Sequence, residues 1–191
     1  MLNLQTLFLA LITALPAIWL CFYSRRKLSI SRITAAFLLG WLIVGALDRA
    51  IIVMLAAGIV TAVAAALLPA FSAEFAPRLL PFLCGGLVGV KMIQLARYIG
   101  AGHIVVILLM VMLMAAAMML LALRFGERVE ILAAAAGGAG ALLTGAGMIP
   151  LLNWLAYPLE AGATTLALAA WLTLTIVGAV FQFRDLRRRS V

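Results

Sequence analysis

The chain has 191 residues, of which 68% are hydrophobic and 10% charged, and its mean hydropathy is +1.26. A soluble domain of this length cannot cover so much apolar surface, whereas a bilayer requires spans of about 20 apolar residues. The composition excludes a soluble globular protein and predicts an all-α, polytopic transmembrane helix bundle, one integral membrane domain over residues 1–191. The net charge of +8 does not indicate nucleic-acid binding, because the basic residues cluster in a loop and a tail, the places where they set membrane topology.

The N-terminal part of the chain contains either two or three predicted spans. The first span covers residues 4–22, and a basic loop follows at 24–32. The next apolar stretch, 33–70, is too long for one crossing and short for two. A turn at Asp48-Arg49 would give seven spans in the whole chain, and one long span would give six.

The distribution of basic residues favours seven spans. Cytoplasmic loops of membrane proteins carry an excess of Lys and Arg. Seven spans place the loop 24–32 and the C-terminal arginines on one side of the membrane, whereas six separate them. We therefore expect the second span to begin near Leu28, the N-terminus to lie outside and the C-terminus in the cytoplasm. The expected location is the cytoplasmic (inner) membrane of a bacterium.

The second half of the chain contains four predicted spans. They cover residues 79–96, 104–123, 131–157 and 163–181. The third of these, 131–157, is long enough to tilt or break. A mixed-charge segment precedes it, and its spacing predicts a solvated loop in which Arg124 pairs with Glu127 and lies near Arg128.

Four polar residues are candidates for a path through the bundle. Asp48 and Arg49 would be costly within hydrocarbon, but they can also cap a turn at the outer interface. Lys91 and Gln94 fall inside a predicted span, on one helical face with Tyr98. We expect this face to point at the bundle interior or a cavity, where Lys91 could pair with a carboxylate or bind an anionic substrate.

No catalytic, metal or cofactor motif stands out in the sequence. His103 is the only histidine and is expected at the membrane interface, while Cys21 and Cys84 lie in apolar runs without a CxxC pair. The methionines of the span 104–123 are expected to serve packing, since no cysteine or histidine accompanies them. We therefore predict no metal site, no cofactor and no enzyme activity.

Small residues recur at four-residue spacing in two predicted spans. Such rows let helix backbones approach closely, which favours helix packing in membranes. The partner helix can belong to the same chain or to another one. The predicted packing positions are Gly85, Gly89, Gly137, Ala141 and Gly145.

Three stretches resemble the PrsW-type glutamic intramembrane protease family. The opening, LFLALITALPAIWLCFYSRRKLSISRITAAFLLGWLI, is similar to that family's first span, basic loop and second span, and 130–151 is similar to a small-residue helix of the family. CGGLVGVKMIQ, residues 84–94, is similar to the family's G-L-x-E-E-x-x-K helix. However, Gly89 and Val90 stand where the family has paired glutamates, and Gln94 stands in place of its lysine. The resemblance therefore implies a relative that has lost its protease chemistry.

These observations lead to one principal functional prediction and two alternatives. We expect a non-enzymatic subunit or scaffold that packs in the bilayer against a larger membrane protein or a second copy of itself. The first alternative is a small-solute or ion transporter or channel with a polar path near Asp48, Arg49 and Lys91. The second is a degenerate intramembrane protease relative.

Overall fold

The computed structural model describes residues 4–47, 50–71, 75–96 and 104–189. These residues form a helical bundle and contain no strand, which confirms the predicted all-α bundle, while the orientation of the termini stays a prediction. The helices are α1 (Leu4–Tyr23), α2 (Leu28–Leu47), α3 (Ile51–Phe71), α4 (Ala76–Ala96), α5 (Ile104–Phe125), α6 (Glu127–Ala146), the short 3₁₀ helix η2 (Pro150–Leu155) and α7 (Ala161–Arg189).

Seven of the described helices are long and apolar enough to cross a membrane. The shortest have 20 residues, which at 1.5 Å per residue span about 30 Å, the thickness of the hydrocarbon core. The ambiguous stretch 33–70 belongs to two helices, α2 and α3, as the charge argument predicted. The chain is therefore an integral membrane protein of multi-pass helical architecture.

The second span begins at Leu28, as predicted, and α2 therefore includes Arg32. Another predicted boundary was wrong. The predicted span 131–157 is two elements: α6 ends at Ala146, and η2 begins at Pro150 after a turn. The apolar residues of η2 extended the hydropathy signal past the helix end, although proline is suited to the first turn of a new helix and not to a helix interior.

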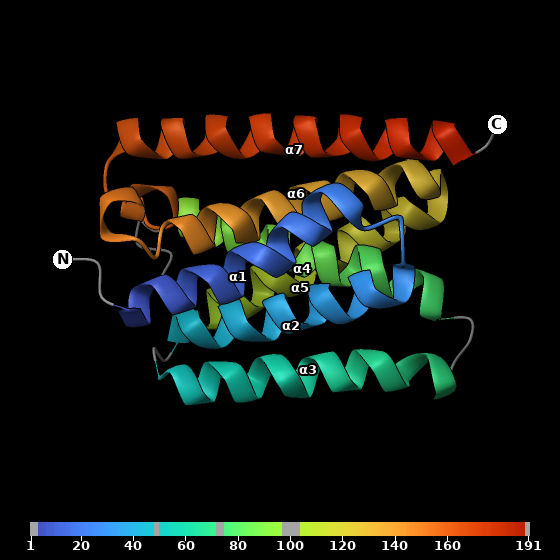
Figure 1. Ribbon diagram of the computed structural model, residues 1–191, viewed down its shortest axis with the longest axis horizontal. Coiled ribbons are helices and arrows are strands. Elements are labelled where there is room, and N and C mark those ends of the chain that lie inside the picture. The colour runs from blue at the N-terminus through green and yellow to red at the C-terminus, as the bar shows by residue number, and fades with distance from the viewer. Residues whose placement is uncertain (1–3, 48–49, 72–74, 97–103, 190–191) are drawn as a thin grey trace.

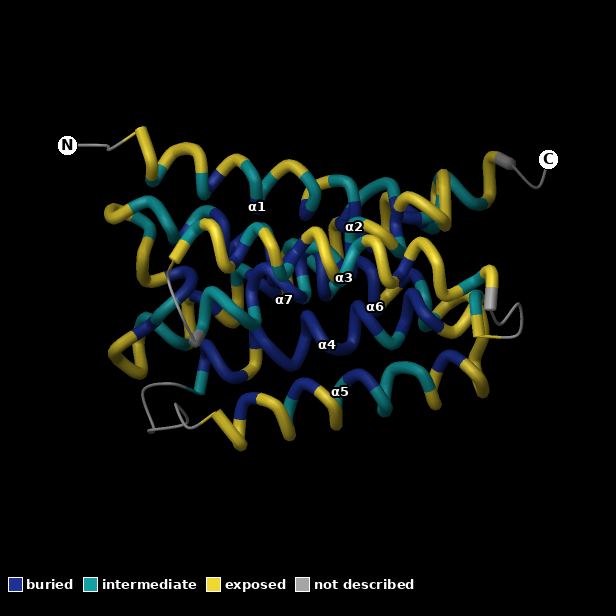
Figure 2. Tube along the Cα trace, turned by 90° about the horizontal axis from the view of Figure 1, so that it is seen from below, coloured by how far each residue is buried: buried dark blue, intermediate teal, exposed yellow. Residues whose placement is uncertain are grey.

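The helix α4 occupies the centre of the bundle. In Figure 1 the helices run side by side, with α3 along one edge and α7 along the opposite edge. Of the span in α4, 83% is buried, against 17% in α3 and in α5, and Figure 2 shows α4 as the longest buried stretch. Glycines in α4 and α6 explain this position, because helices without side-chain bulk at their contacts can pack more neighbours around them.

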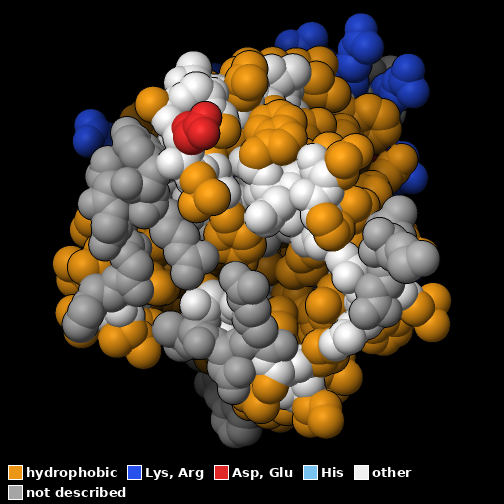
Figure 3. All heavy atoms as spheres, turned by 90° about the vertical axis from the view of Figure 1, so that its left-hand side faces the viewer, with side chains coloured by type: hydrophobic (Ala, Val, Ile, Leu, Met, Phe, Trp, Pro, Cys, Tyr) orange, Lys and Arg blue, Asp and Glu red, His pale blue; other side chains and the backbone are white. Residues whose placement is uncertain are grey.

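The two ends of the bundle differ in charge. One end, here called the basic end, contains the α1–α2 turn, the α5–α6 turn and the last turns of α7. Every described Lys or Arg except Lys91 lies at or near that end. The opposite end contains the start of α1, η2 and the start of α7, and Figure 3 shows the described part of its face as mainly apolar and uncharged apart from an acidic patch. The N-terminus and C-terminus lie at opposite ends (Figure 1).

Candidate functional site

Lys91 is held inside the protein by a backbone carbonyl. Its side chain is 1% exposed, and its Nζ donates a hydrogen bond of 2.5 Å to the carbonyl oxygen of Leu155 in η2. Gly140 of α6 lies against the aliphatic stem of Lys91, where a methyl group would come within 3.1 Å of Cβ. The ammonium group of Lys91 therefore holds η2 against the central helix. Because Gly140 has no side chain, there is room for the aliphatic part of the Lys91 side chain.

Gln94 lies one turn further along α4 and is also buried. Its Oε1 accepts a 2.8 Å hydrogen bond from the hydroxyl of Thr144, which also bonds to the carbonyl of Gly140. Like Lys91, Gln94 therefore faces the interior. Both residues contact α6 or the segment that follows it. Among the described residues, no buried side-chain nitrogen or oxygen lacks a hydrogen-bond partner.

The other candidate path residues cannot be placed. Asp48 and Arg49, between α2 and α3, lie outside the described residues, as do Tyr98 and His103. Whether Asp48 and Arg49 face a polar path stays a prediction.

The glycines of α4 pack against the backbone of α5. A methyl group at Gly85 would lie 2.5 Å from the carbonyl oxygen of Met114, and one at Gly89 would lie 2.8 Å from the Cα of Val111. Ordinary carbon contacts are about 3.5–4.0 Å, so the two helices could not stay this close with larger residues. These glycines set the distance between the central helix and one of its main neighbours.

The small residues of α6 contact other helices of the same chain. Gly137 faces the backbone of Cys84 in α4, and Gly145 faces Thr13 of α1. Ala141 is 1% exposed and belongs to the main core cluster. Since these surfaces are occupied within the chain, a separate partner would have to use other faces.

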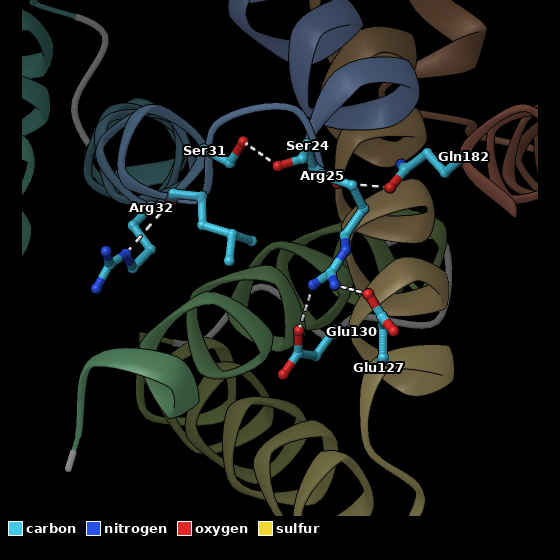
Figure 4. A network of polar contacts seen from close by, with 8 residues as sticks. Ser24, Arg25, Ser31, Arg32, Glu127, Glu130 and Gln182 are labelled. Carbon is cyan, nitrogen blue, oxygen red and sulfur yellow. Dashed lines mark hydrogen bonds and ion pairs between the residues drawn. The ribbon is translucent and has the colours of Figure 1, made fainter. Parts of the chain in front are cut away.

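A buried polar cluster at the basic end escaped the sequence analysis. The hydroxyl of Ser24 donates to Oε1 of Gln182, at 2.6 Å, and Nε2 of Gln182 donates to the carbonyl of Cys21, at 2.7 Å. Ser31 of α2 donates to the carbonyl of Ser24, at 2.7 Å, and Figure 4 shows this group at the α1–α2 turn. The cluster joins α7 to the consecutive helices α1 and α2, from which α7 is distant in the sequence.

Arg25 forms ion pairs with both acidic residues at the start of α6. Its Nη1 lies 2.8 Å from Oε2 of Glu130, and its Nη2 pairs with Glu127 (Figure 4). The expected pairing of Arg124 with Glu127 in a solvated loop was therefore wrong. Residues Glu127 and Glu130 belong to α6, and only Gly126, with φ 63°, separates that helix from α5. Glycine adopts this left-handed conformation at little cost, which permits such a tight turn.

One cavity lies at the opposite end of the bundle, between α1, α2, α3 and the segment around η2. Its volume is about 210 Å³, and its lining mixes apolar side chains with the polar side chains of Thr6, Asn153 and Tyr157. Gly45 and Met54, which also line it, flank the Asp48-Arg49 segment in the sequence. Within the described part of the chain, no three His, Cys, Asp or Glu residues are grouped so that they could hold a metal ion.

Comparisons of the chain with protein-family models, with curated proteins and with solved structures find no match. The resemblance to the PrsW-type family therefore rests only on the similar residue pattern of the three stretches of sequence. Gly89 stands where that family has the first of its paired glutamates. The backbone of α5 occupies the space that a side chain at this position would need.

Proposed function

We propose that this protein is a non-enzymatic membrane subunit or scaffold that binds a larger membrane partner through the lipid-facing sides of α3 and α5. The observation that carries the proposal is the internal pairing of the buried polar groups. Lys91 bonds to Leu155 and Gln94 to Thr144, so these groups serve the fold. A transport site would instead be expected to direct polar groups towards a ligand or a water-filled space.

The outer faces of α3 and α5 are the surfaces best suited to such a partner. These two helices have the smallest buried share of the seven, and large apolar side chains such as Val60 and Leu109 are 66% and 68% exposed. Association in a bilayer depends on packing between such faces, because lipid tails are as apolar as the side chains.

The proposed orientation places the basic end in the cytoplasm. The loop after α1, the α5–α6 turn and the end of α7 would then all follow the positive-inside rule. This arrangement puts the N-terminus outside and fits the cytoplasmic membrane of a bacterium. Reporter fusions at the two termini test it: alkaline phosphatase should be active only at the N-terminus, and fluorescent protein only at the C-terminus.

Site-specific photocrosslinking tests the partner proposal. A photoreactive amino acid at Val60 or at Leu109 should yield an adduct with one other membrane protein. Ile176 of α7 is 63% exposed and provides a matched control that should remain uncrosslinked. The proposal would be contradicted by adducts with a second copy of the chain. It would also be contradicted by equal adducts at all three positions, or by the lack of adducts at Val60 and Leu109.

The cavity of about 210 Å³ favours one alternative, a small transporter or channel. In this alternative, Asp48, Arg49 and Lys91 would lie near a polar path that opens at the end opposite the basic end. Proton flux into vesicles that contain the purified protein and a pH-sensitive dye tests it. The alternative predicts that Lys91→Leu abolishes the flux at normal expression, and normal flux in that variant contradicts it.

A further inference from the structure

A second and larger hollow lies at the basic end, between the α5–α6 turn and the last turns of α7. Its volume is about 680 Å³, within the range of about 300–1,000 Å³ that is typical of small-molecule sites. The helix α6 begins immediately after Gly126, so Phe125 and Glu127 both line the hollow next to the turn. Here this hollow is called the basic groove, and its other lining residues are Arg128, Phe183, Leu186 and Arg187.

The apolar side chains of the basic groove pack against a buried cluster of hydrophobic residues. Phe183 and Leu186 pack against a small cluster of Ile131, Ala135 and Ala179, whose side chains are at most 4% exposed. Phe125, on the other side, is 57% exposed. A molecule in the groove would therefore meet aromatic and aliphatic surface at the level where the helix ends enter the headgroup region.

The charge of the basic groove is positive. Arg128 and Arg187 line it, and both are exposed. Glu127 is the carboxylate in the lining, but it pairs with Arg25 from the α1–α2 turn. The lining therefore carries two guanidinium groups against one carboxylate, which gives it a positive balance of charge. Guanidinium groups bind phosphate oxygens through two parallel hydrogen bonds.

We propose that the basic groove binds an anionic phospholipid of the surrounding membrane. The phosphate would lie between Arg128 and Arg187, and an acyl chain would run over Phe125 and Phe183 towards the hydrocarbon. Basic pockets between helices on the cytoplasmic side are suited to anionic headgroups. The proposal needs only that the basic end lies at a membrane surface, and it does not depend on the subunit function.

Native mass spectrometry of the purified protein in mild detergent tests the site with added phosphatidylglycerol. The double variant Arg128→Gln with Arg187→Gln should bind phosphatidylglycerol about tenfold more weakly, since charged hydrogen bonds to phosphate are lost. Arg78→Gln is the matched control, because Arg78 lies at the same end but outside the groove. It should bind the lipid as the wild-type protein does. Both arginines of the groove are exposed, so circular dichroism should show unchanged helix content.

Three outcomes would overturn the proposal. Equal affinity of the wild-type protein and the double variant would show that the groove does not hold the lipid. An equal loss in Arg78→Gln would show that the charge of the whole basic end, and not the groove, attracts it. Full competition by soluble glycerol phosphate would show a site for a soluble phosphate compound, because the apolar side chains of the groove would then contribute nothing.

Discussion

The ammonium of Lys91 and the backbone carbonyl of Leu155 lie 2.5 Å apart, in two segments separated by 64 positions in the sequence. This bond joins the central helix α4 to the short helix η2. It gives the most polar group inside the bundle a structural role, and it predicts that the loss of the ammonium affects η2 first.

The variant Lys91→Met should loosen η2 while the seven helices remain formed. The Leu155 carbonyl would lose its donor, and local opening should become easier by about 1.4 kcal/mol, a factor of about ten. Hydrogen exchange of the backbone amides in η2 measures this effect. Met92→Leu, a change at an exposed neighbour in α4, is the control. Unchanged exchange in Lys91→Met would show that the bond does not hold η2.

The variant Gly85→Ala should destabilise the contact between α4 and α5. The added methyl group would meet the carbonyl oxygen of Met114 at 2.5 Å, and overpacking of this kind costs about 1–3 kcal/mol. Titration with a denaturing detergent, monitored by helix content, measures the loss. At Gly162 of α7 the same substitution meets no atom within 4 Å, so Gly162→Ala should not destabilise the protein. Equal midpoints for Gly85→Ala and the wild-type protein would contradict the packing account.

The variant Gln182→Leu should weaken the contact between α7 and the end of α1. The substitution leaves the hydroxyl of Ser24 and the carbonyl of Cys21 without their partner, and each buried unsatisfied group costs about 1–3 kcal/mol. The melting temperature in detergent should therefore fall. Val180→Leu, at a half-exposed position of the same helix, should leave it unchanged. A melting temperature for Gln182→Leu equal to that of the control would rule out this role.

Arg25 and Glu130 should be energetically coupled. Their side chains are only 17% and 20% exposed, so water screens this pair less than a pair on the surface. A double-mutant cycle with Arg25→Gln and Glu130→Gln should give a coupling of about 0.5–3 kcal/mol. Strictly additive effects of the two substitutions on the free energy of unfolding would contradict the ion pair.

The sequence was sufficient for the helices and for the number of spans. Hydropathy located most of them, and the clustering of arginines divided 33–70 into α2 and α3. The three-residue spacing of Lys91 and Gln94 follows the helical period, so the sequence also placed these two residues on one face of a helix. Hydropathy failed at the end of α6, because Leu151 and Leu152 are as apolar in a 3₁₀ helix as in a span.

The contacts between distant segments could not be predicted in the same way. Glu127 was expected to pair with Arg124, three residues away, because local spacing is all that one sequence shows. The actual partner, Arg25, is brought to α6 by the packing of α1. Gln182 gave no signal for the same reason, since its partners at Cys21 and Ser24 are about 160 residues away.

The measurement that tests the central claim most directly is purification of the intact protein from native membranes in mild detergent, with quantitative mass spectrometry of what accompanies it. The account predicts one larger membrane protein in a fixed ratio to this chain. It also predicts that a polar substitution on an outer helix, such as Val60→Asn, lowers that ratio while expression stays constant. Recovery of the chain alone, or only with copies of itself, would contradict the proposed subunit function.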